Sequence, residues 1–159
     1  RHLERVKKIK SLSEKFKLRV QILNKDDKIL KAKEIVIINH FGVLNNFFKY
    51  SKSVFIGKSM IKRLKNEGGQ NPIEAAQSMC RIYHGPYVNN FQDIYKILKK
   101  HNISKIVKDY VELSNNLILD MKKPGKKIKK NQNFINDLSK KTLSNTMPLI
   151  DNFLNNEFK

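Results

Sequence analysis

Cysteine is almost absent from this 159-residue chain, which contains only Cys80. A single cysteine excludes an internal disulfide framework and a metal site built from clustered cysteines. Long apolar runs are lacking as well, since no stretch of about 18 consecutive apolar residues occurs, and this excludes a membrane-spanning helix within the chain. The Gly-x-Ser-x-Gly, P-loop and His-Glu-x-x-His signatures are missing, and no spacing of His, Asp and Glu resembles a zinc site. These absences exclude several common classes of enzyme.

What is present suffices for a folded domain. Hydrophobic residues make up 40% of the chain, which is enough to build a core, and 159 residues is the length of one ordinary domain. The chain starts at Arg1 and has neither an initiator Met nor an apolar signal core. We therefore expect it to be part of a longer protein.

Positive charge dominates the composition. The formal net charge is +19, which taken alone suggests nucleic acid or an anionic membrane surface as a partner. Of the 33 basic residues, however, 28 are Lys and only 5 are Arg, the residue that usually reads bases and binds phosphates bidentately. Lys, Asn and Ile are all abundant and all have AT-rich codons, so a genome-wide bias explains the charge without a selected partner. We favour that explanation over a membrane surface and place nucleic acid last.

Hydrophobic periodicity predicts strands that alternate with helices. The predicted helices are residues 3–16, 42–50, 72–79, 91–100 and 110–121, and the predicted strands are residues 18–23, 34–38, 53–57, 81–83 and 104–107. Four β-branched residues in succession, Ile35 to Ile38, are typical of a strand buried on both faces. The alternation predicts an α/β fold, a Rossmann-like parallel sheet with flanking helices. Such sheets bind ligands at the carboxyl ends of their strands, which directs attention to residues 39–42, 57–71 and 84–91.

Composition divides the chain into three segments. Residues 1–121 contain all the predicted strands and form a partial Rossmann-like domain, within which residues 58–67 are expected to be a basic, mobile loop. Residues 122–130 include six Lys in nine residues and are expected to be a solvated basic linker. Residues 131–159 carry apolar residues at helical spacing, which predicts a C-terminal helical segment that Pro148 kinks or splits.

The segment Gly68-Gly69-Gln70-Asn71-Pro72-Ile73-Glu74 is the first candidate site. Two glycines permit a tight turn and a close approach of the backbone to a ligand. Asn71 can cap the following helix, Pro72 suits its first position, and Glu74 falls within its first turn. The free N–H groups of a helix end suit a phosphate, and Glu74 could accept hydrogen bonds from ribose hydroxyls. A capping box of Asn71 and Glu74, which needs no ligand, explains the spacing equally well.

Two further segments are candidates. The turn Asn39-His40-Phe41-Gly42-Val43-Leu44 follows the most apolar strand, so backbone N–H groups of Phe41, Gly42 and Val43 could face a nucleotide, although a short turn without a ligand is the simpler explanation. Arg1 would lie at the end of a preceding strand, where its guanidinium could bind a phosphate bidentately. An unordered terminus is the alternative there.

In their order along the chain, these motifs resemble the C-terminal domain of the 3-deoxy-D-manno-octulosonic acid (Kdo) transferases, the glycosyltransferases that modify lipid A. The resemblance covers about residues 1–120. The matching segments are Arg1-His2-Leu3-Glu4-Arg5, Phe41-Gly42-Val43-Leu44, Phe55-Ile56-Gly57-Lys58-Ser59, Gly68 to Glu74, and Gly85-Pro86 with Asn90-Phe91. Each segment alone is weak, whereas five segments in the right order are fairly specific.

The resemblance implies a B-type glycosyltransferase fold, in which two Rossmann-like domains face a cleft. It also implies transfer of Kdo from CMP-Kdo to a lipid A precursor at the cytoplasmic face of the bacterial inner membrane. The residues that would bind CMP are Arg1, Phe41, Gly42, Val43, Asn71, Pro72, Ile73 and Glu74. Arg1 would bind the phosphate, and the backbone of residues 41–43 would contact the nucleotide. Asn71 and Glu74 would bind the phosphate and the ribose. No metal and no cofactor is implied, since CMP-Kdo is a donor substrate.

Other features of the family would lie outside this chain. The catalytic carboxylate that deprotonates the acceptor hydroxyl belongs to the family's N-terminal domain, through which the lipid A precursor would be met, and the first strands of the C-terminal sheet would precede Arg1. We therefore expect the fragment to be inactive alone and, with apolar sheet edges exposed, only marginally stable. Val43 stands where the family usually has Glu, which leaves only main-chain contacts at that turn.

The alternative is a non-enzymatic function, a basic α/β module that binds nucleic acid or anionic lipid. It predicts binding with a steep salt dependence and no nucleotide preference. Salt-insensitive, CMP-selective binding that is lost in Glu74→Ala would count against it. A decayed gene product without a present function is the third possibility.

Overall fold

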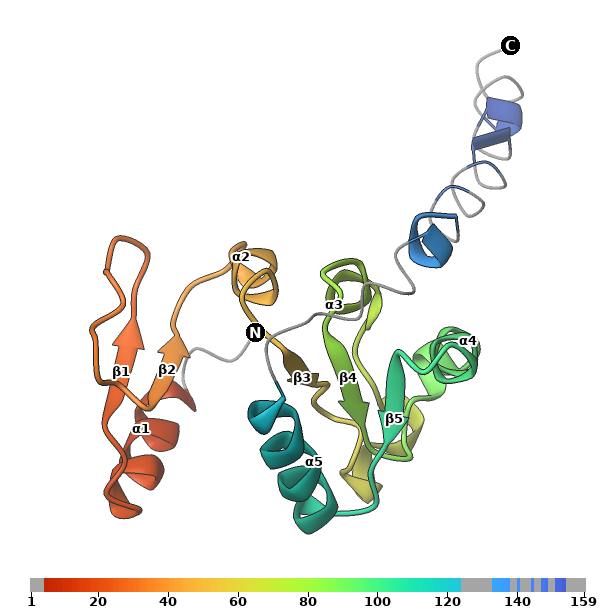
Figure 1. Cartoon of the computed structure of the whole chain (residues 1–159). Coiled ribbons are helices and arrows are strands. Elements are labelled where there is room, and N and C mark those ends of the chain that lie inside the picture. The colour runs from red at the N-terminus through yellow and green to blue at the C-terminus, as the bar shows by residue number, and fades with distance from the viewer. Residues whose placement is uncertain are drawn as a thin grey trace. The chain divides into compact units, whose positions relative to one another are not determined.

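The computed structural model of the chain describes residues 5–123, 133–137, 140, 144, 147, 148 and 151–153. The chain forms two compact units, Arg1–Leu44 and Asn45–Lys159 (Figure 1). Residues 124–132, which include most of the predicted basic linker, lie outside the described residues. The predicted division into residues 1–121, 122–130 and 131–159 therefore stays a prediction.

The first unit contains a helix and two parallel strands. α1 (Val6–Lys15) lies against β1 (Val20–Leu23) and β2 (Ile35–Ile38), which pair from Val20 opposite Ile35 to Leu23 opposite Ile38. The prediction that β2 is buried on both faces is wrong, because all four of its side chains are only half-buried. Among the described residues β1 is its one hydrogen-bonded neighbour, so β2 is an edge strand and its side chains are incompletely covered.

The second unit contains a three-stranded parallel sheet. β3 (Ser53–Phe55), β4 (Arg81–His84) and β5 (Ser104–Ile106) pair in the order β3-β4-β5. The helices are α2 (Leu44–Phe48), α3 (Ile73–Gln77), α4 (Gln92–Lys100) and α5 (Tyr110–Lys122), with 3₁₀ turns η2 (Lys62–Glu67) and η3 (Asn89–Phe91). The strands and helices predicted between residues 3 and 121 are thus confirmed in type, with ends displaced by at most three residues. The predicted loop at residues 58–67 contains η2.

Alternation along β4 assigns the helices to opposite faces of this sheet. Ile82 belongs to a hydrophobic cluster with residues of α3 and α4, whereas the Tyr83 hydroxyl donates to Asp120 of α5 at 2.8 Å. α3 and α4 therefore cover one face of the sheet and α5 covers the other (Figure 1).

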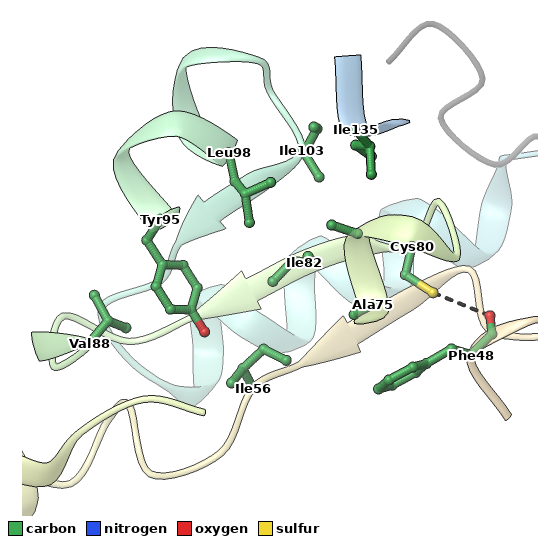
Figure 2. Close-up of a cluster of buried hydrophobic side chains, with 11 residues drawn as sticks. Phe48, Ile56, Ala75, Cys80, Ile82, Val88, Tyr95, Leu98, Ile103 and Ile135 are labelled. Atoms are coloured by element: carbon green, nitrogen blue, oxygen red, sulfur yellow. Dashed lines mark hydrogen bonds between the residues drawn. The ribbon is translucent and has the colours of Figure 1, made fainter. Parts of the chain in front are cut away.

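The hydrophobic core of the second unit lies on the face that α3 and α4 cover. Figure 2 shows side chains from α2, α3, α4 and the loops gathered around Ile82. The cluster comprises Phe48, Ile56, Ala75, Ala76, Cys80, Ile82, Val88, Tyr95, Leu98, Ile103 and Ile135. Cys80 lies fully buried just before β4, and its thiol donates to the Phe48 carbonyl at 3.3 Å. Cys80 therefore behaves as a small buried hydrophobic residue of the core.

Three hydrogen bonds to Asp120 hold α5 against the opposite face of the sheet. The Asp120 carboxylate accepts hydrogen bonds from Ser53 Oγ at 2.6 Å, Tyr83 Oη at 2.8 Å and Arg81 Nη1 at 2.9 Å. Burial, with the Asp120 carboxylate alongside, raises the pKa of Tyr83 to about 12. Ser53 and Arg81 are the first residues of β3 and β4, so α5 is tied to the amino ends of these strands. Their carboxyl ends lead into the loops of the candidate site.

Candidate functional site

The loops that follow β3 and β4 lie side by side. Because the two strands are parallel, both loops leave the same edge of the sheet. The hydroxyl of Ser59, in the first loop, accepts a hydrogen bond from the Gly85 N–H at 2.9 Å, and its carbonyl accepts one from the Tyr87 N–H at 2.9 Å. Two of the segments predicted to meet a ligand, residues 57–71 and 84–91, are thus joined into one surface.

Gly68 and Gly69 are buried where these two loops meet. A Cβ on Gly68 would lie 2.5 Å from the Tyr87 carbonyl oxygen, and a Cβ on Gly69 would lie 3.0 Å from Val88 Cα. The two glycines thus permit a close approach between two backbone segments of the protein itself. The Tyr95 hydroxyl of α4 donates to the Gln70 carbonyl at 3.0 Å, which links the segment before α3 to α4.

Asn71 bonds to the first turn of α3, as the sequence predicts. Its side-chain oxygen accepts a hydrogen bond from the Ile73 N–H at 3.0 Å, so this donor is already paired within the protein. Pro72 is fully buried and has no N–H to offer. The exposed polar side chains at this corner are therefore those of Asn71 and Glu74.

The hydrogen bonding of Glu74 shows whether this segment forms a complete capping box or leaves the carboxylate free. A capping box requires the Glu74 carboxylate to accept a hydrogen bond from the Asn71 N–H. Within the described part of the chain this bond does not form, and the carboxylate makes no other hydrogen bond or ion pair. Asn71 therefore supplies its half of the motif, whereas the exposed Glu74 carboxylate remains available to a ligand.

The turn after β2, in the first unit, contains the second group of predicted residues. Phe41 is 65% exposed, and Gly42 has a φ of +84° with open space around an added Cβ. The N–H groups of Phe41, Gly42 and Val43 find no acceptor among the described residues. Within this described part of the chain, the donors that the prediction requires are therefore unoccupied. Arg1, the remaining predicted residue, lies outside the described residues.

His84 is a buried polar residue whose role could not be predicted from the sequence. It is 4% exposed at the end of β4, its Nδ1 lies 2.7 Å from the Gly85 carbonyl oxygen, and its ring centroid lies 4.3 Å from that of Tyr95. Nε2 is buried and has no partner in the part of the chain that the structure describes. Burial lowers the pKa of His84 below 6.5, so Nδ1 carries the proton of a neutral ring and donates to Gly85. His84 directly follows the apolar residues 82–83 of β4, and this position is the sequence signal that could have indicated its burial.

A groove of about 570 Å³ lies elsewhere on the second unit. Its lining residues are Arg81, Lys99, Asn102, Ile103, Ser104, Lys105, Ile106, Lys108 and Glu112. None of the predicted site residues is among them, so the predicted site is a surface of exposed groups rather than this groove. No three His, Cys, Asp or Glu side chains of the described segments are grouped to hold a metal ion. In those segments no helix combines the length and the apolar character needed to cross a bilayer.

The chain is similar in sequence to curated 3-deoxy-D-manno-octulosonic acid transferases. It is 31% identical to that of Rickettsia typhi over 117 residues, or 74% of this chain and 24% of the relative. It is 28% identical to that of Rickettsia prowazekii over 159 residues, or 97% of this chain and 33% of the relative. It is 24% identical to that of Chlamydia muridarum over 137 residues, or 85% of this chain and 31% of the relative. The chain thus spans a quarter to a third of the length of these relatives, and no family model matches it.

The fold is similar to that of a solved domain. The C-terminal CMP-Kdo binding domain of WaaA from Acinetobacter baumannii superposes with a TM-score of 0.68 and 19% identity, covering 88% of this chain and 69% of that one. At this level of identity the similarity establishes the fold alone. The prediction of an α/β fold with parallel strands and flanking helices is therefore confirmed.

Proposed function

Because the chain is a partial homologue of the Kdo transferases, we propose that it is the donor-binding part of a glycosyltransferase that moves Kdo from CMP-Kdo to a lipid A precursor. The matched relatives are transferases by name, and the structural neighbour is a domain described as binding CMP-Kdo. CMP-Kdo is the donor substrate in this proposal, which includes no metal and no further cofactor.

The observation that carries the proposal is the free Glu74 carboxylate in the first turn of α3, directly after the buried corner of Gly68 and Gly69. Parallel α/β sheets bind their ligands at the carboxyl ends of their strands, and Gly68 and Gly69 pack against the loop that follows the carboxyl end of β4. These contacts hold residues 68–69 in place, and Glu74 is exposed without a protein partner among the described residues. An ionised carboxylate only accepts hydrogen bonds, so it suits the hydroxyls of a ribose rather than a phosphate. The exposed Asn71 amide is a donor that suits a phosphate oxygen.

The other predicted residues supply donors to the nucleotide in this proposal. The N–H groups of Phe41, Gly42 and Val43 have no acceptor in the described part of the chain and suit anionic or carbonyl oxygens of CMP. Arg1 would add a bidentate contact to the phosphate. Pro72 and Ile73 contribute the shape of the corner, since one is buried and the N–H of the other already bonds to Asn71.

The chemical role of the chain is to stabilise the departing CMP. When the bond between the CMP phosphate and the anomeric carbon of Kdo breaks, negative charge grows on the phosphate oxygen. Donors held in place before the reaction lower the free energy of that transition state. The general base that takes the proton from the acceptor hydroxyl would lie outside these 159 residues, as the resemblance implies. We therefore expect the chain alone to bind the donor and to transfer nothing.

The acceptor places the complete enzyme at a membrane. A lipid A precursor is presented at the cytoplasmic face of the inner membrane in this proposal. The net charge of +19 would attract the chain to an anionic lipid surface within a Debye length. Such attraction is non-specific and adds to donor binding without replacing it.

Calorimetric titration of the 159-residue chain with CMP tests the proposal, with GMP as the control nucleotide. We expect saturable binding of CMP at one site, much weaker binding of GMP, and a modest salt dependence. A basic nucleic-acid module would instead lose about 10³-fold or more in affinity between about 50 and 200 mM salt and show no preference for CMP. Equal binding of the two nucleotides would contradict the proposal. Transfer of Kdo to a lipid A precursor by the chain alone would contradict the assignment of the general base.

A further inference from the structure

Ser59 is completely buried although it lies in the loop between β3 and η2. Its hydroxyl donates to the Ile56 carbonyl at 2.6 Å and accepts from the Gly85 N–H at 2.9 Å. Its backbone carbonyl accepts from the Tyr87 N–H at 2.9 Å. Ser59 thus bonds both to the residue that follows β3 and to the loop that follows β4, which makes it the junction between the two loops of the proposed site.

The backbone around Ser59 is arranged to bring this residue inward. Lys58, directly before it, has a φ of +62°, a left-handed conformation that residues other than glycine rarely adopt. On the opposite side of the junction, a Cβ added to Gly85 would collide with the Ser59 carbonyl group. The hydrogen bonds hold the two loops together, and glycine at position 85 permits their close approach because it has no Cβ.

The same contacts extend to the corner that carries Glu74. Tyr87, which Ser59 holds through its carbonyl, and the adjacent Val88 are the residues against which Gly68 and Gly69 pack. Gly69 lies two residues before Asn71, whose side chain bonds to the start of α3. A continuous path of contacts therefore leads from Ser59, through residues 85–88, to the groups that meet the nucleotide in the proposed function.

We propose that Ser59 is a positioning residue of the nucleotide site. It touches no part of the ligand and acts by holding residues 85–88 where they support Gly68 and Gly69. Without its hydroxyl, the Gly85 N–H and the Ile56 carbonyl lose a buried partner, and the loop opens more often. If the open form does not bind, the apparent dissociation constant for CMP rises by the factor by which the closed fraction falls. This inference rests on the proposed function.

The test is Ser59→Ala with Ser104→Ala as the matched control. Ser104 is also buried in this unit, but its hydroxyl has no hydrogen-bond partner among the described residues, so the same atom is removed without breaking a bond. We expect Ser59→Ala to weaken CMP binding about tenfold, which corresponds to a closed fraction of about one tenth. Ser104→Ala leaves CMP binding unchanged. Calorimetric titration measures both affinities.

Amide hydrogen exchange separates positioning from general destabilisation. The Tyr87 N–H bonds to the backbone of Ser59, which Ser59→Ala retains, so faster exchange at Tyr87 reports opening of the loop itself. The core amides of Ile82 and Leu98 keep their exchange rates if the effect is local. Ser59→Cys, which keeps a weaker donor of similar size, gives intermediate values for affinity and for Tyr87 exchange.

Three results would overturn the inference. They are unchanged CMP affinity in Ser59→Ala, an equal loss in Ser104→Ala, or acceleration of the Ile82 and Leu98 amides by the same factor as Tyr87. If the unaltered chain fails to bind CMP, the proposed function fails by that result alone. Tyr87 exchange still shows whether Ser59 holds the loop, because it needs no nucleotide.

Discussion

Two turns of this chain use glycine for different physical reasons. Gly42, in the turn after β2, has a φ of +84° and open space where a Cβ would stand. Gly68, in the corner before α3, has an ordinary φ of −70° but no space, because the Tyr87 carbonyl lies against it. Gly69 combines both demands, with a φ of +82° and Val88 at 3.0 Å from an added Cβ.

The difference shows how each turn is held in place. The turn at residues 41–43 depends on local backbone conformation, and its N–H groups have no acceptor among the residues that the structure describes. The corner at residues 68–74 depends on packing against residues 87–88, which come from another loop. Substitutions in the first turn should therefore strain only the local backbone, whereas substitutions in the corner should also disturb the packing against residues 87–88.

Gly68→Val should produce the largest effect. Its side chain would have to displace the backbone of residue 87, so we expect the second unit to lose about 3 kcal/mol in its free energy of unfolding. Gly57→Val is the control in the same unit, because Gly57 is exposed and has no atom within 4 Å of an added Cβ. Urea denaturation followed by residue-resolved NMR measures both. A loss for Gly68→Val no larger than the control, which should stay within about 0.5 kcal/mol, would show that the corner is not packed.

Gly69→Ala and Gly42→Ala isolate crowding from backbone strain. Both place a Cβ on a residue of nearly equal positive φ, so both should cost about 1–2 kcal/mol through conformation alone. Gly69→Ala should cost about 1 kcal/mol more, because only its Cβ meets another residue. Denaturation followed separately on signals of each unit gives the two values. Equal costs would refute the contrast between the turns.

Glu74→Gln tests the ligand side of the corner. We expect CMP affinity to fall about tenfold, because an amide accepts hydrogen bonds from ribose hydroxyls more weakly than a carboxylate does. Glu67→Gln is the matched control, since Glu67 is an exposed acid in η2 of the same unit and the change in net charge is the same. Titration of each variant with CMP measures the effect. A similar loss in both variants would assign the effect to net charge instead of to Glu74.

His84 should give the smallest effect, a dependence of stability on pH. Burial lowers its pKa in the folded chain below the ordinary 6.5, so below this pH the unfolded chain binds more protons than the folded chain. The second unit should therefore be fully stabilised by this group above pH 6.5 and lose that stability as the pH falls through the folded pKa. His84→Gln removes the titration and should flatten this part of the profile. Identical profiles for the two proteins would contradict the account of His84.

Features that depend on residues close in sequence could be predicted, whereas features that depend on contacts between distant residues could not. Strands and helices follow from periodicity within a few residues, and the cap of Asn71 on Ile73 spans two residues, so both could be predicted from the sequence. The half-buried state of β2 could not, because it depends on which strands lie beside it. Ser59 and Gly85 are 26 residues apart, so the role of Ser59 appears only when β3 and β4 are paired. The glycine pair indicated a close approach, but not that residues 87–88 were the partner.

The most direct measurement is a titration of the ¹⁵N-labelled chain with CMP, followed by the amide shifts of each residue. The account predicts saturable shifts at the amides of Asn71, Ile73 and Glu74, and at those of Phe41, Gly42 and Val43. Shifts confined to the groove lined by Lys105 and Glu112, or no saturable shifts at all, would contradict it.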